Sequence, residues 1–194
     1  MIYIVRHGQT IWNLLGKKQG WKDSPLTKKG ISQSETVAKI LKSEIKNISD
    51  YKFVISPLWR CQQFSSLICE QLGVDYTKCV KEDSLKEHCY GLWEGLTEKE
   101  IEQQFPGELS KRKLEENHWD YIVPEGESYA LVEQRVRQVL EKYENEKVIF
   151  VCHEMISKVI RGCLLNYDKQ YTMSLNHKQN VIYNVTKHGL SELR

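Results

Sequence analysis

The chain has 194 residues, a length typical of one domain, and at this size roughly 70% of the surface of the unfolded chain can be buried. Its 28 Lys and Arg residues nearly balance its 26 Asp and Glu residues, so the net charge of +2 argues against general attraction to nucleic acid or acidic membranes. No stretch approaches the roughly 18 apolar residues of a membrane span or the apolar core of a signal peptide. We therefore expect one domain over residues 1–194, located in the cytoplasm and without nucleic-acid or membrane partners.

Four apolar runs are expected to form strands, and stretches with helical spacing separate them. The runs lie at residues 2–5, 52–55, 147–151 and 181–185. Helices are expected at 27–48 with Thr27 as the N-cap, from Pro57 to Leu72 with a stop at Gly73, at 128–143 and at 154–165. This alternation of strands and helices predicts an α/β architecture.

Residues 87–123 lack strand signals, and short helices are expected after Thr97 and after Gly107. We expect this segment to pass over the edge of the sheet and to form the lid of a pocket. The six cysteines include no CxxC pair, so neither a zinc knuckle nor a thioredoxin-type motif is indicated. They are expected to be reduced and mostly buried, except Cys89, which lies two residues after Glu87 in the expected pocket.

Polar side chains follow three of the expected strands. Arg6 and His7 come after the first strand, Arg60 shortly after the second, and His153 directly after the third, while Gly8 allows the chain to turn away and leave His7 open to a pocket. Strand ends in such a sheet converge on one crevice. Two guanidinium groups and two imidazoles there predict a site for a phosphoryl dianion.

Longer strings around these residues are more specific. In chain order they are RHGQTIWN, GKKQG, DSPLTKKG, SPLWRCQQ around Arg60, LKEHCYGLWEGLT around Glu87 and VIFVCHEMISKVIRG around His153. From end to end the chain resembles the histidine phosphatase superfamily, also called the phosphoglycerate mutase-like family. The resemblance implies a three-layer α/β/α fold with a mostly parallel central sheet and a lid-like insertion at about 88–123.

In a phosphate site, a neutral His7 can attack phosphorus in line and form a phosphohistidine, which replaces one difficult displacement by two easier ones. Glu87 is the candidate that protonates the leaving oxygen and then activates water. The resemblance implies the same roles, with no metal and no cofactor. It places around the phosphate the side chains of Arg6, Arg60, His153 and Asn13, and the candidate substrate-binding residues are Asn13, Gln19, Gly20, Tyr90 and Glu154.

The chain departs from the family pattern at three positions. Glu154 follows the second histidine where relatives usually carry glycine, and Lys17 and Lys158 replace arginines. A carboxylate beside a phosphate dianion would repel it unless Glu154 points away or contacts a cationic part of the substrate. The lysines keep the charge of arginine but lose its paired donors. The string PEGES at 124–128 matches the GES that opens a helix in the phosphatase branch.

Three functions remain open, with hydrolysis of a small phosphate ester favoured. Mutases carry an arginine after the equivalent of Glu87, where this chain has His88, and this chain is too short for their full insertion. The string E-x-x-Y-G keeps a cofactor-dependent phosphoglycerate mutase as the alternative, and a non-catalytic phospholigand-binding domain is the third candidate. The substrate and the oligomeric state stay open.

Two further patterns are set aside. A metalloprotease HExxH is excluded because Ser157 stands where its second histidine would be. The short basic runs at 17–18 and 111–113 are expected to be solvated faces. The remaining histidines are expected to be structural or exposed, namely His88, His118, His177 and His188.

Overall fold

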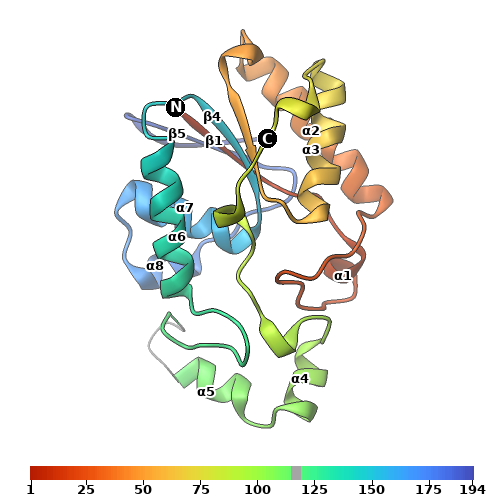
Figure 1. Ribbon diagram of the computed structural model, residues 1–194, viewed down its shortest axis with the longest axis vertical. Helices are drawn as coiled ribbons and strands as arrows, with labels where there is room; N and C mark the ends of the chain where they lie inside the picture. Colours follow the sequence, from red (N-terminus) through yellow and green to blue (C-terminus); the bar gives the residue numbers. More distant parts are fainter. Residues whose placement is uncertain (115–118) are drawn as a thin grey trace.

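The computed structural model describes residues 1–114 and 119–194, and its centre is a six-stranded sheet with the order β3-β2-β4-β1-β5-β6 (Figure 1). Strands β1 to β4 pair in parallel, whereas β5 runs antiparallel to β1, and β6 antiparallel to β5. The mostly parallel sheet is thus confirmed. The strands are β1 (Ile2–Arg6), β2 (Lys52–Ile55), β3 (Val80–Lys81), β4 (Val148–Cys152), β5 (Ile182–Thr186) and β6 (Gly189–Leu193).

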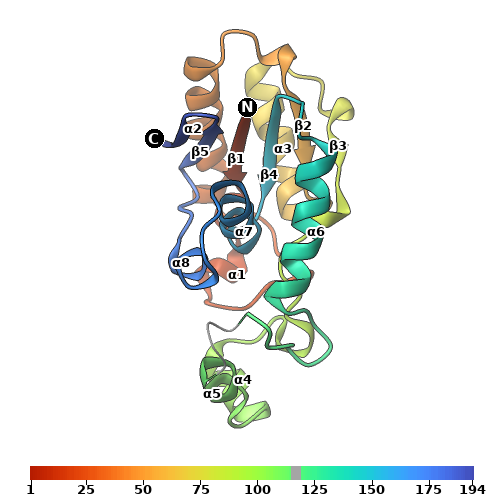
Figure 2. The same ribbon diagram turned by 90° about the vertical axis from the view of Figure 1, so that its left-hand side faces the viewer.

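Helices cover both faces of this sheet, which confirms the three-layer arrangement (Figure 2). Helices α2 and α3 pack on one face, and α6 and α7 pack on the other. The α-helices are α1 (Ile11–Leu14), α2 (Lys28–Glu44), α3 (Trp59–Leu72), α4 (Glu98–Gln104), α5 (Glu108–Leu114), α6 (Tyr129–Lys142), α7 (Glu154–Leu165) and α8 (Lys169–Ser174). Four short 3-10 helices within the described residues are η1 (Ile48–Asp50), η2 (Tyr76–Lys78), η3 (Asp83–Leu85) and η4 (Gly91–Trp93).

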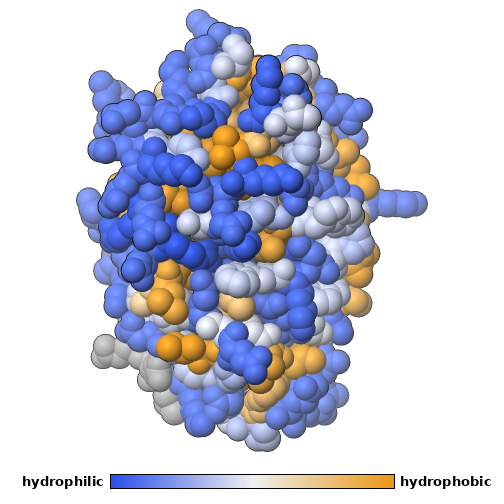
Figure 3. Space-filling model, viewed as in Figure 1, coloured by the Kyte–Doolittle hydropathy of each residue, from blue (hydrophilic) through white to orange (hydrophobic). Residues whose placement is uncertain are grey.

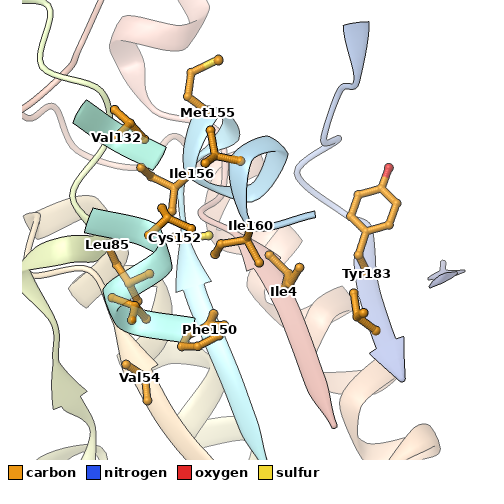
Figure 4. Packing of buried hydrophobic residues seen from close by; sticks show 14 of the residues in the cluster. Ile4, Val54, Leu85, Val132, Phe150, Cys152, Met155, Ile156, Ile160 and Tyr183 are labelled. Carbon is orange, nitrogen blue, oxygen red and sulfur yellow. The ribbon is translucent and has the colours of Figure 1, made fainter. Parts of the chain in front are cut away.

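Alternate residues of each central strand enter different cores. In β1, Tyr3 and Val5 pack with α2 and α3, whereas Ile4 packs with α6 and α7. Figure 4 shows the second of these cores, where Ile4 and Phe150 lie beneath the side chains of α7. Because both faces are buried, the central strands read as continuous apolar runs rather than as alternating ones.

Local signals account for most helix ends. The Thr27 hydroxyl accepts a hydrogen bond from Gly30 N at 3.0 Å and so begins α2, as expected for an N-cap. The helix ends at Glu44, four residues before the expected end, because Ile45 adopts an extended conformation while its side chain stays buried. Apolar spacing therefore continued past the true end of the helix.

Helix α3 begins at Trp59 rather than at the expected Pro57. Its N-cap, Leu58, has no side-chain acceptor, and the carboxylate of Asp23 accepts hydrogen bonds from Trp59 N at 2.8 Å and Arg60 N at 3.3 Å instead. This cap comes from a distant loop, so local sequence could not reveal it. The expected stop at Gly73 is confirmed by its left-handed φ of 66°.

Two strands of the structure, β3 and β6, are not among those that the sequence predicts. Strand β3 has only two residues, too few for a recognisable pattern. Strand β6, with sequence GLSEL, is an edge strand of largely exposed residues, so it lacks the apolar alternation that marks a half-buried strand.

Residues 88–114 and 119–123 lie beyond the carboxyl ends of β1 and β4, where Figure 1 shows α4 and α5. Short helices follow Thr97 and Gly107, as the sequence predicts. The segment has a small core of its own, which includes Trp93, Ile101 and Val123. It is an excursion at the end of the sheet where the candidate polar residues gather.

Hydrophilic residues cover most of the face drawn in Figure 3, and the apolar residues on it form separate groups. Of the helices in residues 1–114 and 119–194, none combines the length and the apolar composition that crossing a membrane requires. All six cysteines are free thiols, and three of them, Cys61, Cys69 and Cys152, are buried.

Candidate active site

The parallel pairing of β1 with β4 brings the two candidate histidines together. Arg6 lies opposite Cys152 in the register, so His7 and His153 follow neighbouring strand ends. Their ring centroids are 5.1 Å apart, and His7 N donates to Cys152 O at 3.0 Å. Gly8 is required at the turn that follows, because a Cβ there would lie 2.4 Å from Gly30 O of α2.

The hydrogen bond of His7 defines which nitrogen is available. Nδ1 lies 2.8 Å from Gly8 O, and since a carbonyl only accepts, Nδ1 carries the proton and Nε2 keeps its lone pair. Burial, together with the charges of Arg60 and Arg6, holds the pKa of His7 well below its ordinary value. The ring is therefore neutral, as a nucleophile must be.

His153 is fully buried beside His7. Its Nε2 lies 2.8 Å from the Ser56 hydroxyl, which follows β2. Burial and then the charge of Arg60 hold the pKa of His153 well below its ordinary value. Two neutral imidazoles therefore lie side by side at the ends of β1 and β4, and a bound dianion would favour proton uptake by His153.

Arg60 is anchored by the loop that precedes α2. Its guanidinium donates to Lys22 O at 3.0 Å, to Asp23 Oδ1 at 2.5 Å and to Gly20 O at 2.7 Å. Gly20 has a φ of +56°, and a Cβ there would lie 2.0 Å from Glu94 Oε1, so glycine is required at this position. The sequence indicated Gly20 as a substrate neighbour, and the structure adds that it supports Arg60.

Arg6 is held by a different pair of residues. It donates to His177 O at 2.6 Å and pairs with Glu154 at 2.9 Å. The Nε atoms of Arg6 and Arg60 are both buried and have no hydrogen-bond partner within the described residues. Both side chains line one cavity, and their positive charges favour an anionic ligand there.

Glu87 enters the same cavity with its carboxyl group buried. Its Oε1 accepts a hydrogen bond from His88 N at 3.0 Å, and its Oε2 from Met155 N in the first turn of α7 at 3.4 Å. Burial raises the pKa of Glu87, although the His88 N–H and the charges of Arg60 and Arg6 act in the opposite direction. A raised pKa favours the protonated form that a general acid requires.

The structure brings the other candidate residues to this cavity, which has a volume of about 240 Å³ and is lined by Asn13, Gln19, Gly20, Tyr90 and Glu154 as well. Asn13 Oδ1 accepts from Thr10 N at 3.1 Å and from Gln179 Nε2 at 3.0 Å. The amide of Gln19 donates to Thr10 Oγ1 at 2.8 Å, so this group is already used within the loop.

The structure shows what surrounds the three residues that depart from the family pattern, Glu154, Lys17 and Lys158. Glu154 pairs with Arg6, and its other oxygen lies 3.9 Å from Lys158 Nζ. The carboxylate therefore neutralises part of the positive charge of the pocket in the free protein. Lys17 lines the cavity. Lys158 donates a hydrogen bond to Met173 O at 3.4 Å in addition to its contact with Glu154.

Several residues that support the site were not indicated by the sequence. Asp23 holds Arg60, and the carboxylate of Glu94 accepts hydrogen bonds from the N–H groups of Trp21, Lys22 and Tyr90. Both look like ordinary surface carboxylates in the sequence. Both lie within strings quoted above, DSPLTKKG and LKEHCYGLWEGLT, but nothing in those strings indicates which backbone or side-chain groups the two carboxylates bind.

The remaining histidines lie mostly away from the chemistry. His88 and His177 are buried, His188 is exposed, and His118 lies outside the described residues. Burial lowers the pKa of both His88 and His177 to about 3. Among residues 1–114 and 119–194, no cluster of His, Cys, Asp and Glu could hold a metal ion.

A family model described as histidine phosphatase superfamily (branch 1) matches residues 2–191. The chain is 34% identical over 171 residues to the Yersinia enterocolitica protein named "Probable phosphoglycerate mutase GpmB", which covers 85% of this chain and 73% of that protein. It is 32% identical to mouse 6-phosphofructo-2-kinase/fructose-2,6-bisphosphatase 1 across 86% of this chain. That match spans only 32% of the mouse protein, so the chain corresponds to about a third of it.

Solved structures show the same fold at lower identity. The α-ribazole phosphatase from Shigella flexneri matches with a TM-score of 0.80 and 21% identity, covering all of this chain and 94% of the other. A mycobacterial glucosyl-3-phosphoglycerate phosphatase matches with a TM-score of 0.79 and 22% identity, covering all of this chain and 96% of the other. The fold and the family expected from the sequence are thus confirmed.

Proposed function

We propose that this chain, which belongs to the histidine phosphatase superfamily (branch 1), is a phosphomonoesterase that hydrolyses a small phosphorylated metabolite through a phosphohistidine on His7. Its relatives include proteins named as phosphatases and as phosphoglycerate mutases. The observation that carries the proposal is the position of His7, whose Nδ1 is bonded to Gly8 O, beside two arginines that line the same cavity. A phosphoryl dianion matches the positive charge and the paired donors of these arginines.

In the first step, His7 Nε2 attacks phosphorus as the ester P–O bond breaks, and the carboxyl of Glu87 gives its proton to the leaving oxygen. In the second step, the Glu87 carboxylate takes a proton from water while the water oxygen attacks phosphorus, the P–N bond breaks, and His7 Nε2 leaves with its lone pair as phosphate is released. Arg6, Arg60 and His153 stabilise the charge on the phosphoryl oxygens in both steps.

The activity is tested with p-nitrophenyl phosphate in the presence of EDTA. We expect steady release of phosphate that is lost in His7→Ala and retained in His188→Ala, a change at an exposed histidine. Release of phosphate by His7→Ala at the wild-type rate would contradict the proposal. Binding of phosphate without any turnover would favour a non-catalytic phospholigand-binding domain.

The size of the cavity supports a small substrate. About 240 Å³ lies below the usual range of ligand pockets, which is roughly 300 to 1,000 Å³, so a phosphoryl group and a few adjoining atoms fill it. The names of relatives suggest a panel that contains phosphoserine, α-ribazole phosphate, glucosyl-3-phosphoglycerate and fructose 2,6-bisphosphate. Comparison of kcat/KM across this panel identifies the preferred leaving group.

A phosphoglycerate mutase is the second candidate, supported by the 34% identity to the GpmB protein. A mutase must protect the phosphohistidine from water until the substrate has turned round. Its signature is conversion of 3-phosphoglycerate to the 2-isomer after priming with bisphosphoglycerate. We expect hydrolysis to exceed this conversion, and the opposite result would assign the chain to the mutases.

A further inference from the structure

Arg135, on α6, directs three of its five guanidinium N–H donors to backbone oxygens of residues 84–87 and the other two to the carboxylate of Glu127. Nε donates to Glu127 Oε1 at 3.0 Å, and Nη1 donates to Ser84 O at 2.7 Å and to Lys86 O at 2.6 Å. Nη2 donates to Glu87 O and to Glu127 Oε2, both at 3.0 Å. A guanidinium has five N–H donors, so none is left over.

Glu127 holds the same segment from its other side. Its Oε2 accepts a hydrogen bond from Cys89 N at 2.8 Å, and its backbone oxygen lies 2.8 Å from His88 Nε2. The ion pair of Arg135 and Glu127 is largely buried, with side-chain exposures of 15% and 14%. The backbone is thus held both before and after Glu87.

Besides Arg135 and Glu127, the segment is held by contacts with single side chains, since Trp21 Nε1 also donates to Glu87 O at 2.8 Å and Tyr90 N donates to Glu94 Oε1 at 3.1 Å. Glu87 follows η3 and precedes η4, and no strand pairing is formed by residues 86–90. The carboxyl group of Glu87 itself contacts only backbone N–H groups, at His88 and Met155, in the hydrogen bonds found within the described residues. Its position therefore depends on where the backbone of the segment lies.

We propose that Arg135, oriented by Glu127, is a positioning residue that places the carboxyl group of Glu87 for proton transfer to the leaving oxygen. The inference rests on the proposed phosphatase activity. A general acid must lie within hydrogen-bond reach of the atom that it protonates, and its contribution is typically about 10²- to 10⁴-fold. Displacement of the segment by even a fraction of a hydrogen-bond length removes part of this factor.

Two substrates of nearly the same size separate positioning of the acid from a general loss of structure. Phenyl phosphate has a poor leaving group that needs a proton, whereas p-nitrophenol leaves readily without one. We expect Arg135→Met to lower kcat/KM about 100-fold for phenyl phosphate and less than about 10-fold for p-nitrophenyl phosphate. The matched control is Arg137→Met on the same helix, an exposed arginine paired with Glu133, and it should change neither value.

A double-mutant cycle with Glu87→Gln shows whether Arg135 acts through Glu87. Once the acid is absent, Arg135→Met should lower kcat/KM for phenyl phosphate by less than about 3-fold. Arg135→Lys keeps the positive charge but offers three N–H donors rather than five, so we expect it to lose at least about 10-fold on phenyl phosphate. Glu127→Gln, which weakens the partner, should cause a loss in the same direction.

Thermal unfolding of each variant reports whether it folds. If Arg135→Met does not fold, the kinetics of Arg135→Lys and Glu127→Gln test the positioning role instead. The inference is overturned if both substrates lose the same factor, if the loss persists undiminished in Glu87→Gln, or if Arg135→Lys matches the wild type. Those results leave the phosphatase activity intact. Absence of turnover of either ester by the wild-type protein contradicts the proposed function itself.

Discussion

The electrostatics of the pocket depend on a few side chains whose effects oppose one another. Burial keeps His7 and His153 neutral and favours the protonated form of Glu87, while Arg6 and Arg60 supply positive charge. The protonation states needed for nucleophilic attack and for proton donation thus follow from the same cause. Removal from water disfavours the charged form of each group, so the carboxyl group of Glu87 tends to keep its proton and the two imidazoles stay unprotonated.

The raised pKa of Glu87 predicts a specific pH dependence. Proton donation requires the acid form, so kcat/KM should fall as the pH rises through the pKa of Glu87. Since Glu87→Gln cannot ionise, the ratio of wild-type to variant activity should decline with rising pH, and ionisation of the substrate cancels in that ratio. A ratio that is constant, or that increases, from about pH 5 to about pH 8 would exclude Glu87 as the acid.

In the proposed mechanism, Glu154 competes with the bound phosphate for Arg6. Its carboxylate lies 2.9 Å from the Arg6 guanidinium and is 32% exposed, so screening by water limits the strength of the pair. We expect Glu154→Gln to lower the inhibition constant of inorganic phosphate about 5-fold, equivalent to ~1 kcal/mol. Glu133→Gln, which removes a surface partner of Arg137, is the control, and weaker phosphate binding by Glu154→Gln would show that the carboxylate helps to bind substrate.

At the scale of elements, the strands and helices follow local patterns, whereas the loops of the site are joined by long-range contacts. The runs that form β1, β2, β4 and β5 and the helix that begins at Glu154 were apparent in the sequence. The cap of α3 by Asp23 was not, because its donors and acceptor are 36 or 37 residues apart.

The same distinction holds for the site. The strings around Arg6, His7, Arg60, Glu87 and His153 point to one cavity. The structure brings the first four residues to its lining, and it places His153 fully buried beside His7. The roles of Glu94, Glu127 and Arg135 could not be inferred, since each is an ordinary charged residue until the backbone atoms that it contacts are known. Sequence patterns locate the reacting groups better than the residues that hold them.

Glu94 joins the loop after α1 to the segment 88–123. Its buried carboxylate accepts hydrogen bonds from Trp21 N at 2.8 Å, Lys22 N at 2.9 Å and Tyr90 N at 3.1 Å. Removal of this acceptor leaves several N–H groups without a partner, so we expect Glu94→Ala to lower the free energy of unfolding by about 3 kcal/mol. Urea denaturation measures this loss.

The matched control for that change is Glu98→Ala. Glu98 pairs with Lys18, but its side chain is 68% exposed, so its removal should alter the free energy of unfolding by less than about 0.5 kcal/mol. Equal effects of the two substitutions would show that the Glu94 carboxylate does not hold the two loops together.

For the whole molecule, buried histidines link stability to pH. The pKa of His88 and of His177 is about 3 in the folded protein, whereas in the unfolded chain it is about 6.5. Below about pH 6.5 the unfolded chain therefore binds protons that the folded protein does not, and stability falls as the pH falls. Each histidine contributes a slope of about 1 kcal/mol per pH unit.

We therefore expect the protein to lose stability between about pH 7 and about pH 5, as measured by urea denaturation at each pH. The raised pKa of Glu87 acts in the opposite direction, but it is one group against several buried imidazoles. His188→Ala, at an exposed site, should leave the slope unchanged. A free energy of unfolding that is constant or rises toward pH 5 would mean that these rings are accessible to protons in the folded state.

The covalent role of His7 is tested most directly by rapid acid-free quenching of the protein during turnover, followed by mass analysis of the intact chain and its peptides. We expect one acid-labile phosphoryl group, located on the peptide that contains His7 and absent from His7→Ala. Turnover without such an adduct, or an adduct on another residue, would contradict the phosphohistidine mechanism.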